Sequence, residues 1–179
     1  MRIHTLHKEQ FIRRSLQEVF SFFEKPENLA RITPPWLGFR IITPSPVPMH
    51  KGIIIEYSIR VMGRRMRWKS LISEYEPPVR FVDEQASGPY AFWSHTHTFI
   101  TVDGGTLVTD NVRYALPLGV LGSVVHSLVV RRQLEHIFSY RAGVIEEIFG
   151  KGEFVGDQVS PGSSSTIVIH QKENHAHPT

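Results

Sequence analysis

The chain has 179 residues, of which 41% are hydrophobic and 21% charged, and its formal net charge at pH 7 is +3. This composition excludes disorder of the whole chain and suits one folded domain with a sizeable core. The chain contains no cysteine, which excludes disulfides, thiolate metal ligands and a cysteine nucleophile, and which favours a cytoplasmic location. The mild positive charge does not predict a dedicated nucleic-acid partner.

The first elements are predicted to be a strand and a helix. Residues 7–13 mix polar and apolar side chains as a short strand does, and a helix is predicted over residues 15–24. Ser15 and Glu18 have the spacing of a capping box, which marks the start of this helix. A proline ends it, and residues 27–32 allow one or two further helical turns before the next prolines.

A run of strands is predicted for the middle of the chain, where apolar and polar residues alternate. An Asp-Gly-Gly turn at residues 103–105 is typical of a tight hairpin between the last two strands. The predicted strands are residues 39–43, 53–61, 65–72, 81–86, 91–102 and 106–115.

A long amphipathic helix is predicted to follow the strands. Residues 124–148 carry apolar side chains largely at spacings of three and four, which predicts a helix of roughly 25 residues. The apolar stretch 116–130 is interrupted and falls short of the roughly 18 residues that span a bilayer, and the chain opens without a secretory signal. We therefore expect one domain over residues 1–150 and a flexible tail over residues 151–179, in which residues 166–169 could add an edge strand.

The order of these elements predicts an α+β architecture. Strands joined by short turns form an antiparallel sheet, and the long terminal helix is the element able to cover one face of it. A curved sheet of about seven strands cannot pack tightly against one helix along its whole length. We therefore expect a cavity between sheet and helix, closed by the two short helices that follow the first strand.

Short motifs over residues 5–150 carry a resemblance to a known superfamily. They are Asn28-Leu29, Ile32-Thr33-Pro34-Pro35-Trp36, Pro77-Pro78, Phe81-Val82-Asp83-Glu84-Gln85, Gly88-Pro89-Tyr90, Trp93-x-His95-x-His97-x-Phe99, Gly104-Gly105-Thr106, Asp110-x-Val112-x-Tyr114 and Leu116-Pro117-x-Gly119. As an ordered series they resemble the START-like superfamily, also called SRPBCC or helix-grip proteins. The nearest branch is the bacterial ligand-binding proteins labelled polyketide cyclase/dehydrase or "cell division inhibitor". The resemblance implies a helix-grip fold and a pocket for a hydrophobic ligand, and it implies no particular reaction.

Polar residues are predicted to face this cavity. Alternation places Trp93, His95, His97 and Phe99 on one face of their strand, with small hydroxyl residues on the other. The aromatic face is expected to point inward, and the two imidazoles with it. Across the hairpin, Asp110 shares a face with apolar residues, so that a buried carboxylate is expected there. Because an isolated buried charge is costly, one of the two histidines is its expected partner.

Three interpretations of this cluster stay open at this point. Asp83 and Gln85 share a face with Phe81 on the preceding strand and could extend the cluster. It could be a polar network that fixes strand register, or a recognition site for the polar group of a ligand. It could also be catalytic, with an Asp–His pair as general acid and base, or bind a metal through the two histidines.

The residues predicted to contact a ligand are Gln85, Tyr90, Trp93, His95, His97, Phe99, Asp110 and Tyr114. If the protein is an enzyme, the catalytic candidates are His95, His97 and Asp110. No cofactor and no resident metal are predicted. A metal held by the two histidines and Asp110 would leave no group to orient the imidazoles.

Flexible side chains elsewhere could also reach the cavity. Met49, Met62 and Met66 are expected to line it or to fill the core. Arg141 falls near the apolar stripe of the long helix and could reach a ligand carboxylate. The commoner outcome for such an arginine is that it extends to the surface or pairs with an acid.

The leading hypothesis is a non-enzymatic protein that binds a small hydrophobic molecule, such as a lipid, an isoprenoid, a quinone-like or a polyketide-like compound. One alternative is a cyclase, dehydratase or hydrolase that uses the same cavity. Another is an interaction module, because Arg65, Arg67 and Lys69 share one strand face that could bind RNA or an anionic membrane. The oligomeric state is left open by the sequence.

Overall fold

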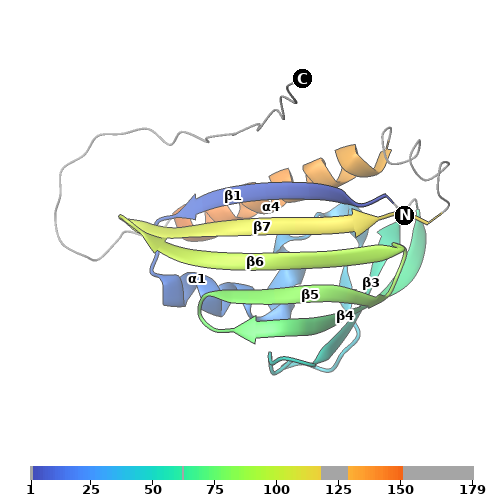
Figure 1. Cartoon of the computed structure of the whole chain (residues 1–179), viewed down its shortest axis with the longest axis horizontal. Coiled ribbons are helices and arrows are strands. Elements are labelled where there is room, and N and C mark those ends of the chain that lie inside the picture. Colours follow the sequence, from blue (N-terminus) through green and yellow to red (C-terminus); the bar gives the residue numbers. More distant parts are fainter. Residues whose placement is uncertain (1, 62, 118–128, 151–179) are drawn as a thin grey trace, which may run out of the picture.

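The computed structural model describes residues 2–61, 63–117 and 129–150. Its centre is a seven-stranded antiparallel sheet with the order β1-β7-β6-β5-β4-β3-β2, and Figure 1 shows this sheet curving from β7 toward β3. The strands are β1 (His4–Ile12), β2 (Arg40–Ile41), β3 (Ile54–Val61), β4 (Arg64–Glu76), β5 (Arg80–Ser87), β6 (Phe92–Val102) and β7 (Gly105–Ala115).

The predicted strands are confirmed, and the main differences in length are in β1, β2 and β4. β1 begins at His4, three residues before the predicted start. β2 has two residues where five were predicted, because a proline-rich segment follows it and proline cannot donate to a sheet ladder. β4 runs to Glu76, four residues further than predicted. Register shifts between β4 and β5 accommodate the extra length and allow the sheet to bend.

The short helices follow β1 as predicted. Helix α1 (Leu16–Phe23) begins at Ser15, whose side chain accepts a hydrogen bond from the backbone N–H of Glu18. The Glu18 carboxylate accepts the Ser15 backbone N–H in return, which completes the predicted capping box. The helical turns η1 (Pro26–Asn28), α2 (Leu29–Ile32) and η2 (Pro35–Leu37) come next.

The long helix α4 (Arg131–Gly150) packs on the same face of the sheet as α1, and Figure 1 shows it passing behind β1 and β7. The predicted beginning of this helix at residue 124 and the predicted tail over residues 151–179 lie outside the described residues, and so does Met62. In the part of the chain that the structure describes, no helix is both long and apolar enough to cross a membrane.

The core between sheet and helices has a tightly packed part at the α1 end. Phe20 of α1 contacts Phe99 of β6 edge to face, with ring centroids 5.3 Å apart. Val108 of β7 and Ile145 of α4 complete this packing, and both are buried. The helix-grip fold is confirmed, and the α1 helix fills one end of the space that the sheet and α4 enclose.

Candidate functional site

Four polar side chains from three adjacent strands meet on the inner face of the sheet. Asp83 of β5 lies opposite His95 of β6, and His97 of β6 lies opposite Asp110 of β7. Because residues two apart in a strand share a face, this register brings all four side chains together. We call the group of Asp83, His95, His97 and Asp110 the Asp–His box.

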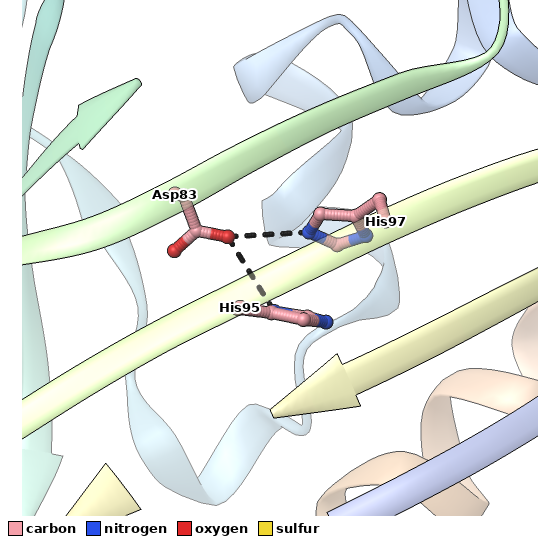
Figure 2. A group of neighbouring side chains, drawn as sticks. All are labelled: Asp83, His95 and His97. Atoms are coloured by element: carbon pink, nitrogen blue, oxygen red, sulfur yellow. Dashed lines mark hydrogen bonds and ion pairs between the residues drawn. The ribbon is translucent and has the colours of Figure 1, made fainter. Parts of the chain in front are cut away.

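Each histidine of the box lies between the two carboxylates. Asp83 Oδ2 lies 3.2 Å from His97 Nε2 and 3.4 Å from His95 Nδ1, as Figure 2 shows. Asp110 Oδ1 lies 2.8 Å from His95 Nε2 and 2.9 Å from His97 Nδ1. The last contact is an ion pair without hydrogen-bond alignment, because the His97 Nδ1 atom lacks a hydrogen-bond partner. Every imidazole nitrogen therefore faces a carboxylate oxygen.

The protonation of the box follows from these contacts. Burial and the charge of His97 lower the pKa of His95 below its usual value. Burial opposes the charge of His97 as well, but the contacts with Asp110 and Asp83 outweigh it and raise the pKa of His97. Of the two rings, His97 therefore binds a proton more readily and His95 less readily than an isolated imidazole.

The two carboxylates of the box are ionised. Burial alone would raise the pKa of each, but nearby positive charge outweighs it. Arg141 and the two histidines hold the pKa of Asp110 well below its usual value. The contact with His97 and the charges of His95, His97 and Arg141 lower the pKa of Asp83 in the same direction.

Arg141 of α4 is the fifth ionisable residue at this place, and here the commoner expectation from the sequence is wrong. Its side chain neither extends to the surface nor pairs with an acid: Arg141 is only 9% exposed, and no described carboxylate lies within ion-pair distance. The guanidinium lies over the rings of Phe23 and Phe138, at 5.3 and 5.8 Å from their centroids. These aromatic faces hold the cation inside the fold.

A cavity of about 200 Å³ lies between the sheet and α4. Its wall is mainly apolar, and its carboxylate, imidazole and guanidinium groups belong to Asp83, His95, His97 and Arg141. The apolar wall includes residues of β3 and β4, of α4, and of the segment from α2 to η2. They are Ile55, Tyr57 and Trp68; Leu134, Ile137 and Phe138; and Leu29 and Leu37. The predicted cavity between sheet and terminal helix is therefore present.

The structure divides the eight predicted ligand-contacting residues into two groups. Those in the cavity wall are Tyr90, Trp93, His95 and His97. Those outside the wall are Gln85, Phe99, Asp110 and Tyr114. Contact of the first group with a ligand stays a prediction, whereas the second group is built into the structure around the cavity.

Each residue of the second group has a structural partner. Phe99 packs under α1, and Asp110 lies behind the two histidines of the box. The side-chain amide of Gln85 donates to the carbonyl oxygen of Tyr90 and accepts the N–H of the same residue. Tyr114 is buried against the rings of Tyr90 and Trp93, at 5.9 and 6.1 Å. Gln85 and Tyr114 thus hold the wall residue Tyr90 in place.

Sequence reasoning missed the contribution of β3 and β4 to the wall. Trp68 is 5% exposed, stacks on Tyr57 at 5.9 Å and contacts Trp93 edge to face at 5.3 Å. The alternation along residues 53–61 was a usable signal, because Ile55, Tyr57 and Ile59 share the inward face. Of the methionines, Met49 lies in the wall and Met66 does not.

The box could in principle hold a metal ion. Among the described residues, Asp83, His95 and His97 form one group whose ligand atoms all lie within 4.8 Å of one another. These atoms already pair with opposite charge inside the box, and the charge of Arg141 acts on both carboxylates. A metal ion bound there would have to displace these contacts.

The basic strand face lies on the outside of the sheet. Arg67 and Lys69 lie 3.1 and 3.7 Å from the carboxylate of Glu56, and Arg65 donates to the hydroxyl of Ser58 at 2.8 Å. Glu56 therefore offsets part of the positive charge of this face. Its binding to RNA or to a membrane stays a prediction.

Comparison with protein-family models identifies the class of protein. The model described as "Polyketide cyclase / dehydrase and lipid transport" matches residues 12–138. The chain belongs to this family, which confirms the resemblance to START-like proteins. A comparison with curated proteins gives no match.

Solved structures agree on the fold. A START superfamily protein from Mycobacterium smegmatis is 14% identical over 81% of this chain and 99% of its own, with a TM-score of 0.59. Protein CV1439 from Chromobacterium violaceum is 11% identical over 83% of this chain and 99% of its own, with a TM-score of 0.64. The di-domain ARO/CYC protein StfQ of the steffimycin biosynthetic pathway is 12% identical over 83% of this chain and 51% of its own, also with a TM-score of 0.64.

Proposed function

We propose that this protein binds a small hydrophobic molecule in the cavity between the sheet and α4, without transforming it. The observation that carries the proposal is the cavity itself: about 200 Å³ of space inside the fold, with a mainly apolar wall. Apolar surface that faces an internal space gains free energy when a ligand replaces water there. The family description, which includes lipid transport, supports the same function.

The size of the cavity favours a slender or small ligand. Pockets for drug-sized molecules typically measure about 300–1,000 Å³, so this cavity lies below that range. A single alkyl chain or one or two fused rings suits it better than a large polycyclic compound. Lipid-like and isoprenoid-like ligands of this size are the class we propose.

The Asp–His box supports binding rather than acid–base catalysis. A general base must offer a nitrogen lone pair to its substrate at hydrogen-bond distance. All four imidazole nitrogens of His95 and His97 instead lie within 3.4 Å of a carboxylate oxygen of the box. This arrangement suits a rigid polar wall, and it leaves no imidazole nitrogen away from a carboxylate to face a substrate.

Calorimetric titration with neutral ligands tests the proposal. Decan-1-ol and naphthalen-1-ylmethanol are slender and uncharged, and we expect both to bind the wild type at one site. Ile137→Phe places a larger side chain in the cavity wall and should weaken binding of both at least tenfold. Ile100→Phe, on the exposed outer side of β6, is the matched control and should bind as the wild type does. Absence of binding to both ligands, or equal binding by Ile137→Phe, would contradict the proposal.

A further inference from the structure

Among the described residues, three buried nitrogen atoms of the cavity wall lack hydrogen-bond partners. His97 Nδ1 is paired with the charge of Asp110 at 2.9 Å, and the other two have no such contact. One is Nε of Arg141 on α4, and the other is Nε1 of Trp68 on β4. The side chains are nine-tenths buried or more, with exposures of 9% and 5%. A buried polar group without a partner costs free energy comparable to a lost hydrogen bond, so such groups are rare unless something else satisfies them.

Both unpartnered groups are donors only. An indole N–H and a guanidinium have no acceptor atom, and the guanidinium keeps its charge at every physiological pH. The ligand that satisfies them must therefore bring acceptor oxygens. Because a guanidinium binds a carboxylate more strongly than a neutral acceptor, the oxygen at Arg141 is best carried by an anion.

The position of Arg141 fits the end of an amphipathic ligand. Phe23 and Phe138 hold its guanidinium beside the Asp–His box, while Leu134 and Ile137 extend the apolar wall along the same helix. One end of the cavity wall thus carries the Arg141 guanidinium and the polar Asp–His box, and the rest is apolar. A molecule with one acidic end and an apolar body matches both parts.

We propose that the natural ligand is an organic acid whose carboxylate pairs with Arg141 and whose apolar body lies against Leu134 and Ile137. This inference rests on the proposed function and specifies the chemical class of the ligand. A fatty acid and an aromatic carboxylic acid share the required chemistry, and the experiment below distinguishes them.

The charges of the groups around Arg141 determine how the cavity wall responds to a bound anion. Asp83 and Asp110 are ionised beside the cation of Arg141, and of the two imidazoles His97 binds a proton more readily than His95. A carboxylate bound at Arg141 adds one negative charge. The ring of His95, between the two carboxylates, is the group placed to take up a proton in response.

Matched acid and alcohol pairs test the inference. We expect decanoate to bind at least tenfold tighter than decan-1-ol at pH 7, or naphthalene-1-carboxylate to bind at least tenfold tighter than naphthalen-1-ylmethanol. A preference confined to the first pair indicates a fatty acid, and one confined to the second indicates an aromatic acid. Equal affinity within both pairs would overturn the inference and leave the proposed function standing. Failure of all four compounds to bind would overturn the proposed function itself.

Substitution of the arginine locates the preference. Arg141→Gln should abolish the tighter binding of the acid while binding of the alcohol stays within about twofold. Arg131→Gln is the matched control, because Arg131 begins the same helix and is exposed and paired with Glu135 at 3.0 Å. Retention of the preference by Arg141→Gln would overturn the assignment.

A measurement on the wild-type protein tests the same inference and does not depend on whether the Arg141→Gln variant folds. The Nε–H signal of Arg141 in a nitrogen–proton correlation spectrum should shift on saturation with the preferred acid and stay in place with the matching alcohol. An unchanged signal at saturation with the acid would show that the carboxylate binds elsewhere, which contradicts the inference.

Discussion

The two halves of the protein interior are built from the same elements but differ in packing. At the α1 end, Phe99 of β6 and Ile145 of α4 are covered by α1 and are 1% and 2% exposed. Further along the same two elements, Trp93 and Ile137 line the cavity. We call these regions the filled half and the hollow half. The difference arises because α1 is short and covers only one end of the face that α4 spans.

In this fold an inward-facing apolar residue can either pack in the core or line the cavity. In the filled half, truncation leaves a new void among well-packed atoms. In the hollow half, the side chain already borders the cavity, and polar groups in the same wall determine which ligands the cavity binds. Three predictions follow from this contrast, beginning with the polar wall, where we expect the largest effect on stability.

Asp110→Asn should destabilise the protein by about 3–5 kcal/mol at pH 7, because it removes one partner of a buried ion pair and leaves His97 partly uncompensated. Urea denaturation monitored by circular dichroism measures this loss. The pKa of Asp110 is lowered in the fold, so its contribution to stability is present above the unfolded-state pKa of 3.8 and is lost as the pH falls through the folded-state value. The gap between wild type and variant should therefore narrow in strong acid.

The control for this variant is Asp103→Asn in the exposed β6–β7 turn, which should change stability by less than about 0.5 kcal/mol. If Asp110→Asn lowers the free energy of unfolding no more than this control does, the Asp–His box does not stabilise the hollow half.

A matched pair of substitutions on α4 separates the two halves. Ile145→Ala should cost about 2–5 kcal/mol, because the filled half cannot collapse around the lost atoms. Ile137→Ala should cost only about 1 kcal/mol, because its side chain is partly exposed to the cavity, and it should alter the affinity for decan-1-ol. Equal loss of stability in both variants would remove the distinction between the halves.

The pH dependence of acid binding gives the smallest expected effect. His95 faces Asp83 on β5, His97 on β6, Asp110 on β7 and Phe138 on α4, with the cation of Arg141 also on α4.

The pKa of His95 is lowered in the free protein, and a bound carboxylate should raise it, so the complex holds more protons between the two values. The affinity for the preferred acid should therefore rise as the pH falls from 8 to 6, by at most about tenfold per pH unit. Calorimetric titration in buffers of different ionisation enthalpy measures the accompanying proton uptake. A pH-independent affinity for the acid would argue against His95 as the proton acceptor.

The sequence predicted the fold well because its signals are local. Alternation identified the strands, and the capping box at Ser15 and Glu18 identified the start of α1. The meeting of His95, His97 and Asp110 was also predictable, since an Asp-Gly-Gly hairpin fixes the register of β6 against β7.

The remainder of the site depends on tertiary packing, which the sequence pattern does not reveal. Phe99 and Trp93 have the same period-two position, and only the placement of α1 decides that one packs and the other lines the cavity. Gln85 faces inward as expected, but its amide is used by the backbone of Tyr90. Arg141 was expected at the surface, and its burial could not be predicted from the sequence pattern. The aromatic faces that hold its cation come from separate elements, Phe23 of α1 and Phe138 of α4.

The central claim, that the hollow half binds the ligand, is tested most directly by intermolecular nuclear Overhauser effects to methyl groups. With decan-1-ol at saturation, we predict contacts from the alkyl chain to the methyl groups of Leu134 and Ile137, and none to those of Val108 and Ile145. Contacts to neither pair, or equal contacts to both pairs, would contradict the account.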